Sequence, residues 1–214
     1  MIINRFLYPV LRTAVLPGLL LLFLSLSAQA REQRILVLGD SISAAYGMSL
    51  EQGWVSLLAQ QLAESEPTPE VINASISGET TSGGLRRLPE LLARHDPSLV
   101  VIELGANDGL RGYPIKQLRA NLEDMVRLSR DSGAEVVLVA MEIPPNYGAR
   151  YTADFRESFT EVARSTGSTL APFLLDGVAI DPAMMQEDGI HPGVEAQPIL
   201  LQNILPSIQS ALAQ

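Results

Sequence analysis

The sequence predicts a three-layer α/β/α fold with about five parallel strands. Short apolar runs alternate along the chain with longer segments that repeat apolar residues at helical spacing. The runs at residues 34–39 and 98–104 are almost entirely apolar, which is typical of strands buried on both faces of a parallel sheet. Strands separated by single helices require right-handed crossovers, which place helices on both faces of the sheet. The expected arrangement is therefore flavodoxin-like.

The expected elements of the first half are bounded by Gly, Pro and Asp residues, which commonly end helices and strands. The helix expected at 52–64 places Trp54 on one face with three leucines, so we expect Trp54 in the core. The elements are a strand at 34–39, a helix at 52–64, a strand at 70–74, a polar Gly-rich loop at 77–84 and a helix at 85–94.

The second half continues the alternation of strands and helices. Pro144 and Pro145 cannot continue a strand ladder, so they are expected in a loop. The final helix is expected to be interrupted or kinked near Pro198. The elements are a strand at 98–104, a helix at 114–130, strands at 135–141 and 169–173 around a helix at 154–165, an irregular region at 176–187 and a helix at 194–212.

The first thirty residues have the pattern of a secretory signal peptide. Arg5 and Arg12 supply a positive start, residues 14–24 are largely apolar, and an A-x-A cleavage signal occupies 28–30. The apolar run is shorter than the roughly 20 residues of a spanning helix, so the pattern favours cleavage over a retained anchor. We expect residues 31–214 to form a single domain in the periplasm or outside the cell.

Composition and charge exclude several kinds of partner. Without Arg5 and Arg12, the 15 Lys and Arg residues fall to 13 against 24 Asp and Glu, a formal charge of −11. Such an acidic surface argues against nucleic acid and anionic phospholipid head groups, but not against a neutral or zwitterionic lipid. The chain has no Cys, which excludes disulfides, thiolate metal sites and a lipid-modified N-terminal Cys. Because no phosphate loop, metal-ligand cluster or partner-binding pattern is present, we expect a monomer without metal or cofactor.

Four segments far apart in the sequence carry residues suited to acyl transfer. Ser41 follows the first strand, Gly78 the second and Asn107 the third, and Asp188 and His191 precede the last helix. The carboxyl ends of parallel strands meet at one edge of the sheet, where ligands of open α/β sheets bind. We therefore expect these residues to gather at that edge.

Acyl transfer needs a nucleophile, a base, a group that orients the base, and donors for the oxyanion. Ser41 can be the nucleophile and His191 the base, and Asp188 is close enough in sequence to bind one imidazole nitrogen. The backbone N–H groups of Ser41 and Gly78 and the amide of Asn107 would be the oxyanion donors. Each residue could also have an ordinary structural role, Ser41 and Asp188 as helix caps and Gly78 and Asn107 as turn residues.

The same residues resemble the GDSL or SGNH hydrolase family. Four sequence blocks match in order: Gly39-Asp40-Ser41, Gly78, Gly105-x-Asn107-Asp108 and Asp188-x-x-His191. The longer strings at 39–47, 73–78 and 188–192 are similar to one branch, the exported bacterial thioesterase I, lysophospholipase and arylesterase group. No Gly-x-Ser-x-Gly surrounds Ser41, since position 43 is Ser, so the nucleophile elbow of the α/β-hydrolases is absent.

The resemblance implies an activity and a set of site residues. It implies a Ser41, His191 and Asp188 triad, with Ser41, Gly78 and Asn107 as oxyanion donors. It also implies a serine hydrolase that cleaves acyl esters and thioesters, such as acyl-CoA, lysophospholipids and aryl esters, without metal or cofactor. Close relatives often have Gly at position 106, where this chain has Ala, but Asn107 remains in place.

Loop position and the resemblance together suggest walls for an acyl chain. Gly83, Tyr147 and Tyr151 are the candidate substrate-binding residues there. The remaining histidine, His95, is expected at a solvated helix end rather than in catalysis. Two other functions stay open, a carbohydrate O-acetyl esterase of the same superfamily and a non-catalytic lipid-binding protein of the export compartment.

Overall fold

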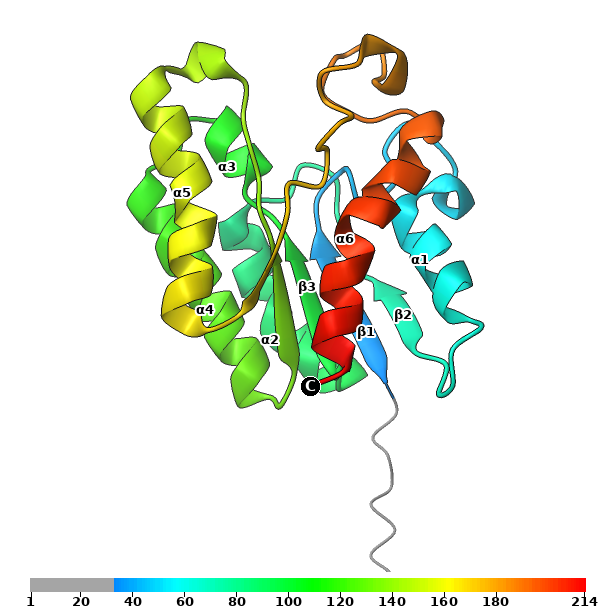
Figure 1. Ribbon diagram of the computed structural model, residues 1–214. Coiled ribbons are helices and arrows are strands. Elements are labelled where there is room, and N and C mark those ends of the chain that lie inside the picture. The colour runs from blue at the N-terminus through cyan, green and yellow to red at the C-terminus, as the bar shows by residue number, and fades with distance from the viewer. Residues whose placement is uncertain (1–32) are drawn as a thin grey trace, which may run out of the picture. The chain divides into compact units, whose positions relative to one another are not determined.

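Five parallel strands form the central sheet of the computed structural model, which describes residues 33–214 (Figure 1). The sheet order is β2-β1-β3-β4-β5, and all four neighbouring pairs are parallel, as the sequence predicts. The predicted signal peptide at 1–30 lies outside the described residues. The strands are β1 Arg34–Gly39, β2 Glu70–Asn73, β3 Leu99–Glu103, β4 Glu135–Val139 and β5 Thr169–Ala171.

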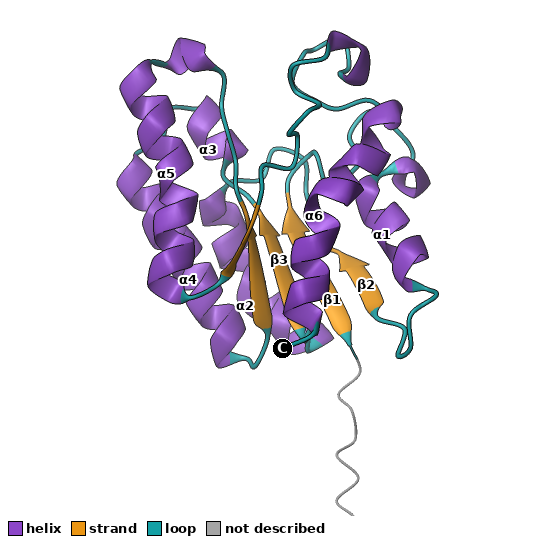
Figure 2. Ribbon diagram, viewed as in Figure 1, coloured by secondary structure: helices purple, strands orange, loops and turns teal. Residues whose placement is uncertain are grey.

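Helices connect successive strands and follow the last one (Figure 2). The α-helices are α1 Trp54–Leu62, α2 Thr81–His95, α3 Ala106–Leu110, α4 Ile115–Asp131, α5 Ala149–Thr166 and α6 Gln197–Leu212. Short 3-10 turns occur at η1 Leu50–Gln52, η2 Pro145–Tyr147, η3 Pro182–Met184 and η4 Val194–Ala196.

The sheet separates two hydrophobic clusters, which makes the expected three layers. Ile35 and Val37 of β1 pack with α1 and α6, whereas Leu36 and Leu38 pack with α2, α4 and α5. This alternation follows from the two-residue period of a strand. All four side chains are fully buried, as is Trp54 in the first cluster, so the predicted core position of Trp54 is confirmed.

Three of the predicted helix starts differ from the structure by three residues or more, and the short helix α3 was not predicted. α5 begins at Ala149, directly after Gly148, rather than at residue 154. α2 begins at Thr81 rather than residue 85, because the Thr80 side chain accepts a hydrogen bond from the Gly83 N–H and caps the helix there. The last α-helix begins at Gln197, after a 3-10 turn, so Pro198 lies in its first turn. The predicted interruption near Pro198 is therefore present as the change from the 3-10 turn to the α-helix, and a proline in the first turn removes no helical hydrogen bond.

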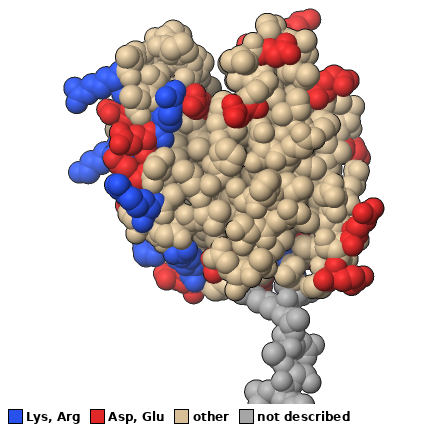
Figure 3. Space-filling view, viewed as in Figure 1, with Lys and Arg blue, Asp and Glu red and all other residues tan. Residues whose placement is uncertain are grey.

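Charged side chains are unevenly spread over the surface (Figure 3). Lys and Arg gather over α4 and α5, and Asp and Glu predominate at the opposite edge. Within residues 33–214, no helix combines the length and the apolar character needed to cross a membrane.

Candidate active site

Ser41 lies on the tight turn that directly follows β1. The Ala44 N–H donates to the Asp40 carbonyl at 2.9 Å, and the Tyr46 N–H donates to the Ser41 carbonyl at 3.0 Å. The Ser41 residue is only 9% exposed. Its backbone N–H has no hydrogen-bond partner among residues 33–214, so this donor is available to a bound group.

Ser41, His191 and Asp188 form one continuous chain of hydrogen bonds. The distance from Ser41 Oγ to His191 Nε2 is 2.8 Å, and that from His191 Nδ1 to Asp188 Oδ2 is 2.6 Å. The structure thus brings together a hydroxyl and an imidazole that are 150 residues apart in sequence.

The turn at 188–191 fixes both the carboxylate and the imidazole. Asp188 Oδ1 accepts the backbone N–H groups of Ile190 at 2.9 Å and His191 at 3.0 Å. Hydrogen bonds to the carboxylate lower the pKa of Asp188 to about 2. The largest effect comes from the His191 backbone N–H, followed by the His191 side chain and the Ile190 N–H. An ionised Asp188 accepts the Nδ1–H of His191, which leaves Nε2 to accept the hydroxyl proton of Ser41.

Gln186 connects the turn at 188–191 to the turn that carries Ser41, a contact that the sequence did not predict. Its Nε2 donates to the carbonyl oxygens of Tyr46 at 2.7 Å and Pro192 at 3.0 Å, and its backbone N–H donates to the His191 carbonyl at 2.8 Å. The Tyr46 ring lies against His191, with ring centroids 4.4 Å apart. Gly47 has φ of +79°, a conformation that favours glycine, and a Cβ there would overlap the Gln186 amide. Tyr46 and Gly47 belong to the string that resembles the hydrolase family, which was the available signal.

The loop that carries Gly78 is tied to the end of β1 and to α3. The Ile76 N–H donates to the Gly39 carbonyl at 3.1 Å. Gly78 has φ of +78°, a conformation that favours glycine, and its carbonyl accepts from Arg111 Nη2 at 3.1 Å. Within the described part of the chain, the Gly78 N–H has no hydrogen-bond partner.

Asn107 lies in the first turn of α3, the helix that begins at Ala106 and is separated from the end of β3 by two residues. Its Nδ2 donates one hydrogen to Asp40 Oδ2 at 3.1 Å. A primary amide has two N–H donors, so the second remains for a ligand. Since Asp40 directly precedes Ser41, this hydrogen bond holds the Asn107 amide beside the turn that carries Ser41.

Two buried aspartates brace these loops. Burial raises the pKa of Asp40 to about 6, against the lowering effects of the Ile42 N–H bond, the His191 charge and the Asn107 amide. Asp108 accepts the Thr81 N–H at 2.9 Å and the Thr81 hydroxyl at 2.6 Å. Asp108 therefore connects the start of α2, just after the Gly78 loop, to α3.

A largely apolar cavity of about 350 Å³ opens beside these residues. It lies between the loops that follow β4 and β5, and Figure 3 shows a notch at that edge of the molecule. Another hollow, of about 420 Å³ between α4 and α5, is lined by charged residues such as Lys116, Arg119 and Glu123. The side chains lining the first cavity include Ile42, Leu110, Met141, Ile143, Phe173 and Ile190.

The three candidate wall residues lie in different places. The Tyr147 hydroxyl donates to the Leu110 carbonyl at 2.9 Å, and the Tyr151 hydroxyl donates to the Tyr113 carbonyl at 2.8 Å. Both tyrosines thus brace the segment that contributes Leu110 to the cavity. Gly83 is buried in α2, where a Cβ would overlap the Glu79 carboxylate, and none of these three residues lines the cavity itself.

The remaining candidates and a metal site can be placed from the same geometry. His95 ends α2 just before β3 begins, at the opposite edge of the sheet from Ser41. No group of three or more His, Cys, Asp or Glu side chains in the described region could hold a metal ion.

Comparison with known proteins identifies the family. The profile of the GDSL-like lipase/acylhydrolase family matches residues 37–197. Esterase TesA of Pseudomonas aeruginosa is 50% identical over 202 residues, which cover 94% of this chain and 100% of that protein. The chain belongs to the GDSL-like lipase/acylhydrolase family.

Other similar proteins support this assignment. Thioesterase 1/protease 1/lysophospholipase L1 of Escherichia coli K12 is 39% identical over 194 residues, which cover 91% of each chain. The crystal structure of TesA superposes with a TM-score of 0.81 at 51% identity, covering 84% of this chain and 99% of that one. The predicted resemblance and the predicted fold are therefore confirmed, and membership of the GDSL-like family makes the chain a hydrolase.

Proposed function

We propose that this hydrolase cleaves acyl esters and thioesters through a covalent acyl-enzyme on Ser41. The observation that carries the proposal is the position of His191, whose two ring nitrogens contact Ser41 Oγ and Asp188 Oδ2. A nucleophile bound to a base, and a base bound to an orienting carboxylate, is the arrangement that activates a serine hydroxyl.

The proton of Ser41 passes to His191 Nε2 as Oγ attacks the carbonyl carbon. The tetrahedral intermediate then expels the alcohol or thiol, which takes the proton from Nε2, and the acyl group remains on Oγ as an ester. Water attacks this ester as His191 Nε2 accepts its proton. The second tetrahedral intermediate then expels Ser41 Oγ, which takes that proton back from Nε2, and the carboxylic acid leaves. Asp188 stays ionised throughout because its pKa of about 2 lies far below neutral pH.

The carbonyl oxygen becomes negative in both steps and needs donors. The N–H groups of Ser41 and Gly78 supply two, since neither has a partner among the described residues. The free N–H of the Asn107 amide supplies a third. Donors fixed in advance stabilise the developing charge without reorganisation in the transition state.

The cavity supports an acyl chain as the substrate group. Its volume of about 350 Å³ falls in the range of small-molecule sites, roughly 300–1,000 Å³. Two residues that line the cavity are sequence neighbours of the proposed catalytic residues: Ile42 directly follows Ser41, and Ile190 directly precedes His191. The cavity therefore begins next to the reacting atoms. The relatives named esterase and thioesterase 1/lysophospholipase L1 support the same substrate classes.

Labelling with a fluorophosphonate tests the nucleophile. We expect stoichiometric labelling of the wild type at Ser41 and none of Ser41→Ala, measured by intact-protein mass spectrometry. Ser210→Ala is the matched control, because Ser210 is an exposed serine on α6. Labelling of Ser41→Ala would assign the nucleophile elsewhere. An unlabelled wild type that still bound lipid would make the chain a binding protein instead.

A substrate panel tests the acyl group. We expect octanoyl and palmitoyl esters and acyl-CoA to be hydrolysed with higher kcat/KM than acetyl esters, because only longer chains fill the apolar cavity. A preference for acetylated sugars would contradict this proposal and indicate a carbohydrate O-acetyl esterase.

We propose further that the enzyme is exported and acts as a monomer after removal of residues 1–30. The support is the sequence pattern, with Arg5, Arg12, an apolar run and an A-x-A signal at 28–30. N-terminal sequencing of the protein from the periplasm or culture medium should find Arg31 first. A cytoplasmic protein that retains Met1 would contradict export.

A further inference from the structure

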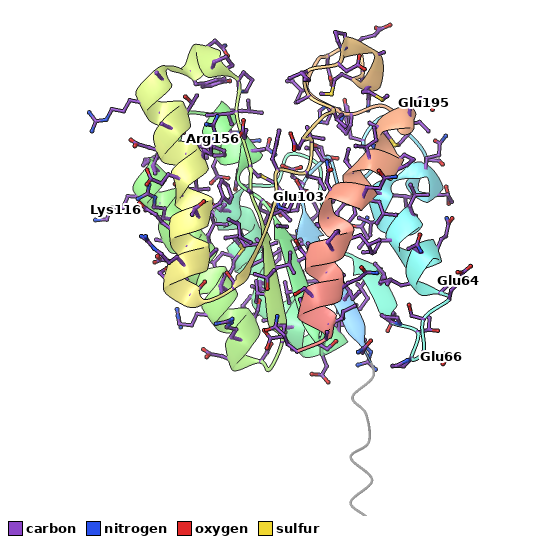
Figure 4. All side chains as sticks on the ribbon, in the orientation of Figure 1. Glu64, Glu66, Glu103, Lys116, Arg156 and Glu195 are labelled. Atoms are coloured by element: carbon purple, nitrogen blue, oxygen red, sulfur yellow. The ribbon has the colours of Figure 1, made fainter. Side chains whose placement is uncertain are left out.

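Glu103 is a fully buried acid that the proposed mechanism does not use. It ends β3, and its neighbour across the sheet is Gly39, the last residue of β1. Its side chain points to the sheet face of α1 and α6, because it lies two residues after Val101. Figure 4 shows Glu103 at the carboxyl ends of the strands, between the two halves of the molecule.

One oxygen of Glu103 binds the turn on both sides of Ser41. Glu103 Oε2 accepts the Ser43 hydroxyl at 2.6 Å and the Asp40 backbone N–H at 3.2 Å. Asp40 precedes Ser41 and Ser43 follows two residues later. Oε1 is buried and has no partner among the described residues, so all of the polar contact is made to this turn.

Gly39 provides the space that this contact needs. A Cβ at position 39 would lie 2.6 Å from Glu103 Oε2 and 2.7 Å from Ser43 Oγ, closer than such atoms approach. The glycine at the strand end therefore allows the Glu103 carboxyl to enter beneath the turn. The contact between the Glu103 carboxyl and the turn at 40–43 therefore depends on glycine at position 39.

The charge state of Glu103 matters for its neighbour Asp40. Burial, followed by the negative charge of Asp40, raises the pKa of Glu103 well above its ordinary value. A neutral Glu103 leaves Asp40 as the charged member of the pair. Asp40 then accepts the Asn107 amide through Oδ2 and the Ile42 N–H through Oδ1.

We infer that Glu103 is a positioning residue that holds the turn at 40–43, and with it the Ser41 hydroxyl and backbone N–H, for the reaction. This inference rests on the proposed function. Glu103 borders the proposed acyl cavity, but it is fully buried and its hydrogen bonds go to the turn, so its loss lowers kcat more than it changes KM. The single chemical requirement is an acceptor at the position of Oε2.

Two substitutions of similar size separate the acceptor from the volume. Glu103→Gln keeps an oxygen for the Ser43 and Asp40 donors, and Glu103→Met removes the acceptor. Misplacing a reacting group by about 1 Å can cost roughly 10²-fold in rate. We expect Glu103→Met to lower kcat for an octanoyl ester by about 10- to 10²-fold with KM within about twofold. Glu103→Gln should keep at least about a third of the wild-type kcat.

A strand glutamate outside the site serves as the control. Glu135→Gln alters a glutamate at the amino end of β4, and its kcat and KM should match the wild type. Equal kcat in Glu103→Met and the wild type would overturn the inference. Equal losses in Glu103→Gln and Glu103→Met would overturn the role as a hydrogen-bond acceptor.

Ser43→Ala tests the same contact without altering the buried acid, in case Glu103→Met does not fold. Removing the hydroxyl that donates to Oε2 should lower kcat about three- to tenfold and leave KM unchanged, as expected for one hydrogen bond. An unchanged kcat would overturn the inference. Fluorophosphonate labelling of the wild type is measured first. A wild type that is not labelled would overturn the proposed function and this inference together, whereas labelling with equal kcat values would overturn this inference alone.

Discussion

Burial of Glu103 predicts a specific dependence of stability on pH. In the unfolded chain this glutamate ionises near its ordinary pKa of 4.5, whereas in the folded protein burial and the nearby Asp40 charge raise the pKa well above that value. Between these two pKa values the folded state binds one proton more than the unfolded state. The free energy of unfolding must then fall as the pH rises, by about 1.4 kcal/mol per pH unit for one proton.

Glu103→Gln removes this proton and isolates its contribution. Asp40 adds a slope of the same sign between its ordinary pKa of 3.8 and its folded value of about 6. Because Asp40 ionises while Glu103 is still neutral, this slope is shared by both proteins and cancels in the difference. Between the two pKa values of Glu103, the unfolding free energy of Glu103→Gln should therefore rise with pH relative to that of the wild type, with a slope of at most about 1.4 kcal/mol per pH unit.

Urea unfolding across this pH range measures the difference directly. Trp54 is the single tryptophan and is fully buried, so its fluorescence reports unfolding. Glu135→Gln provides the control and should give a curve parallel to that of the wild type. Parallel curves for Glu103→Gln and the wild type would show that Glu103 is ionised in the folded protein, and would refute the argument from burial.

Three further substitutions test the site and its supports. Asn107→Ala should lower kcat by about 10²–10³-fold by removing one oxyanion donor, and an unchanged kcat would exclude that role. Arg111→Ala removes the exposed donor to the Gly78 carbonyl and should lower kcat by about two- to tenfold, with Arg86→Ala as an unaffected control. Gly39→Ala should destabilise the fold by about 1–3 kcal/mol in urea unfolding, because its Cβ would overlap the Glu103 carboxyl, and wild-type stability would show that the carboxyl can move.

The sequence was informative where one local pattern determines the structure. The apolar run at 35–38 predicted a strand buried on both faces, and all four residues are fully buried. Helix starts were less predictable, because α2 begins at a Thr80 cap inside a stretch that reads as a polar Gly-rich loop. Pro198 indicated an interruption but not where the α-helix starts, because proline is also common in the first turn of a helix, and α6 begins at Gln197 after a 3-10 turn.

The site residues fall into two groups: some could be predicted from residue type, and others have roles that depend on tertiary contacts. Ser41, Asp188 and His191 could be proposed because few residue types perform their chemistry and because the four blocks resemble a family. Gln186 and Glu103 could not, since a glutamine in a loop and a glutamate at a strand end are usually exposed. Their roles arise from the contact with the Tyr46 carbonyl and from the pairing of Gly39 with Glu103, which no single segment encodes.

The strand order explains why these contacts converge beside Ser41. In the order β2-β1-β3-β4-β5, the chain turns from one direction across the sheet to the other between β1 and β3. The connections after these two strands diverge to opposite faces, which leaves a crevice at their carboxyl ends. Ser41 follows β1, while Glu103 ends β3 and Asn107 follows it, so the proposed nucleophile, its proposed support and a proposed oxyanion donor come from the two strands that border this crevice. A hydrogen bond across the pair, from Asn107 to Asp40, and another from the Asp40 N–H to Glu103 then fix the two loops relative to each other. Substitutions at 39, 40, 103 and 107 should therefore be strongly non-additive in kcat, because each acts on the same pair of loops.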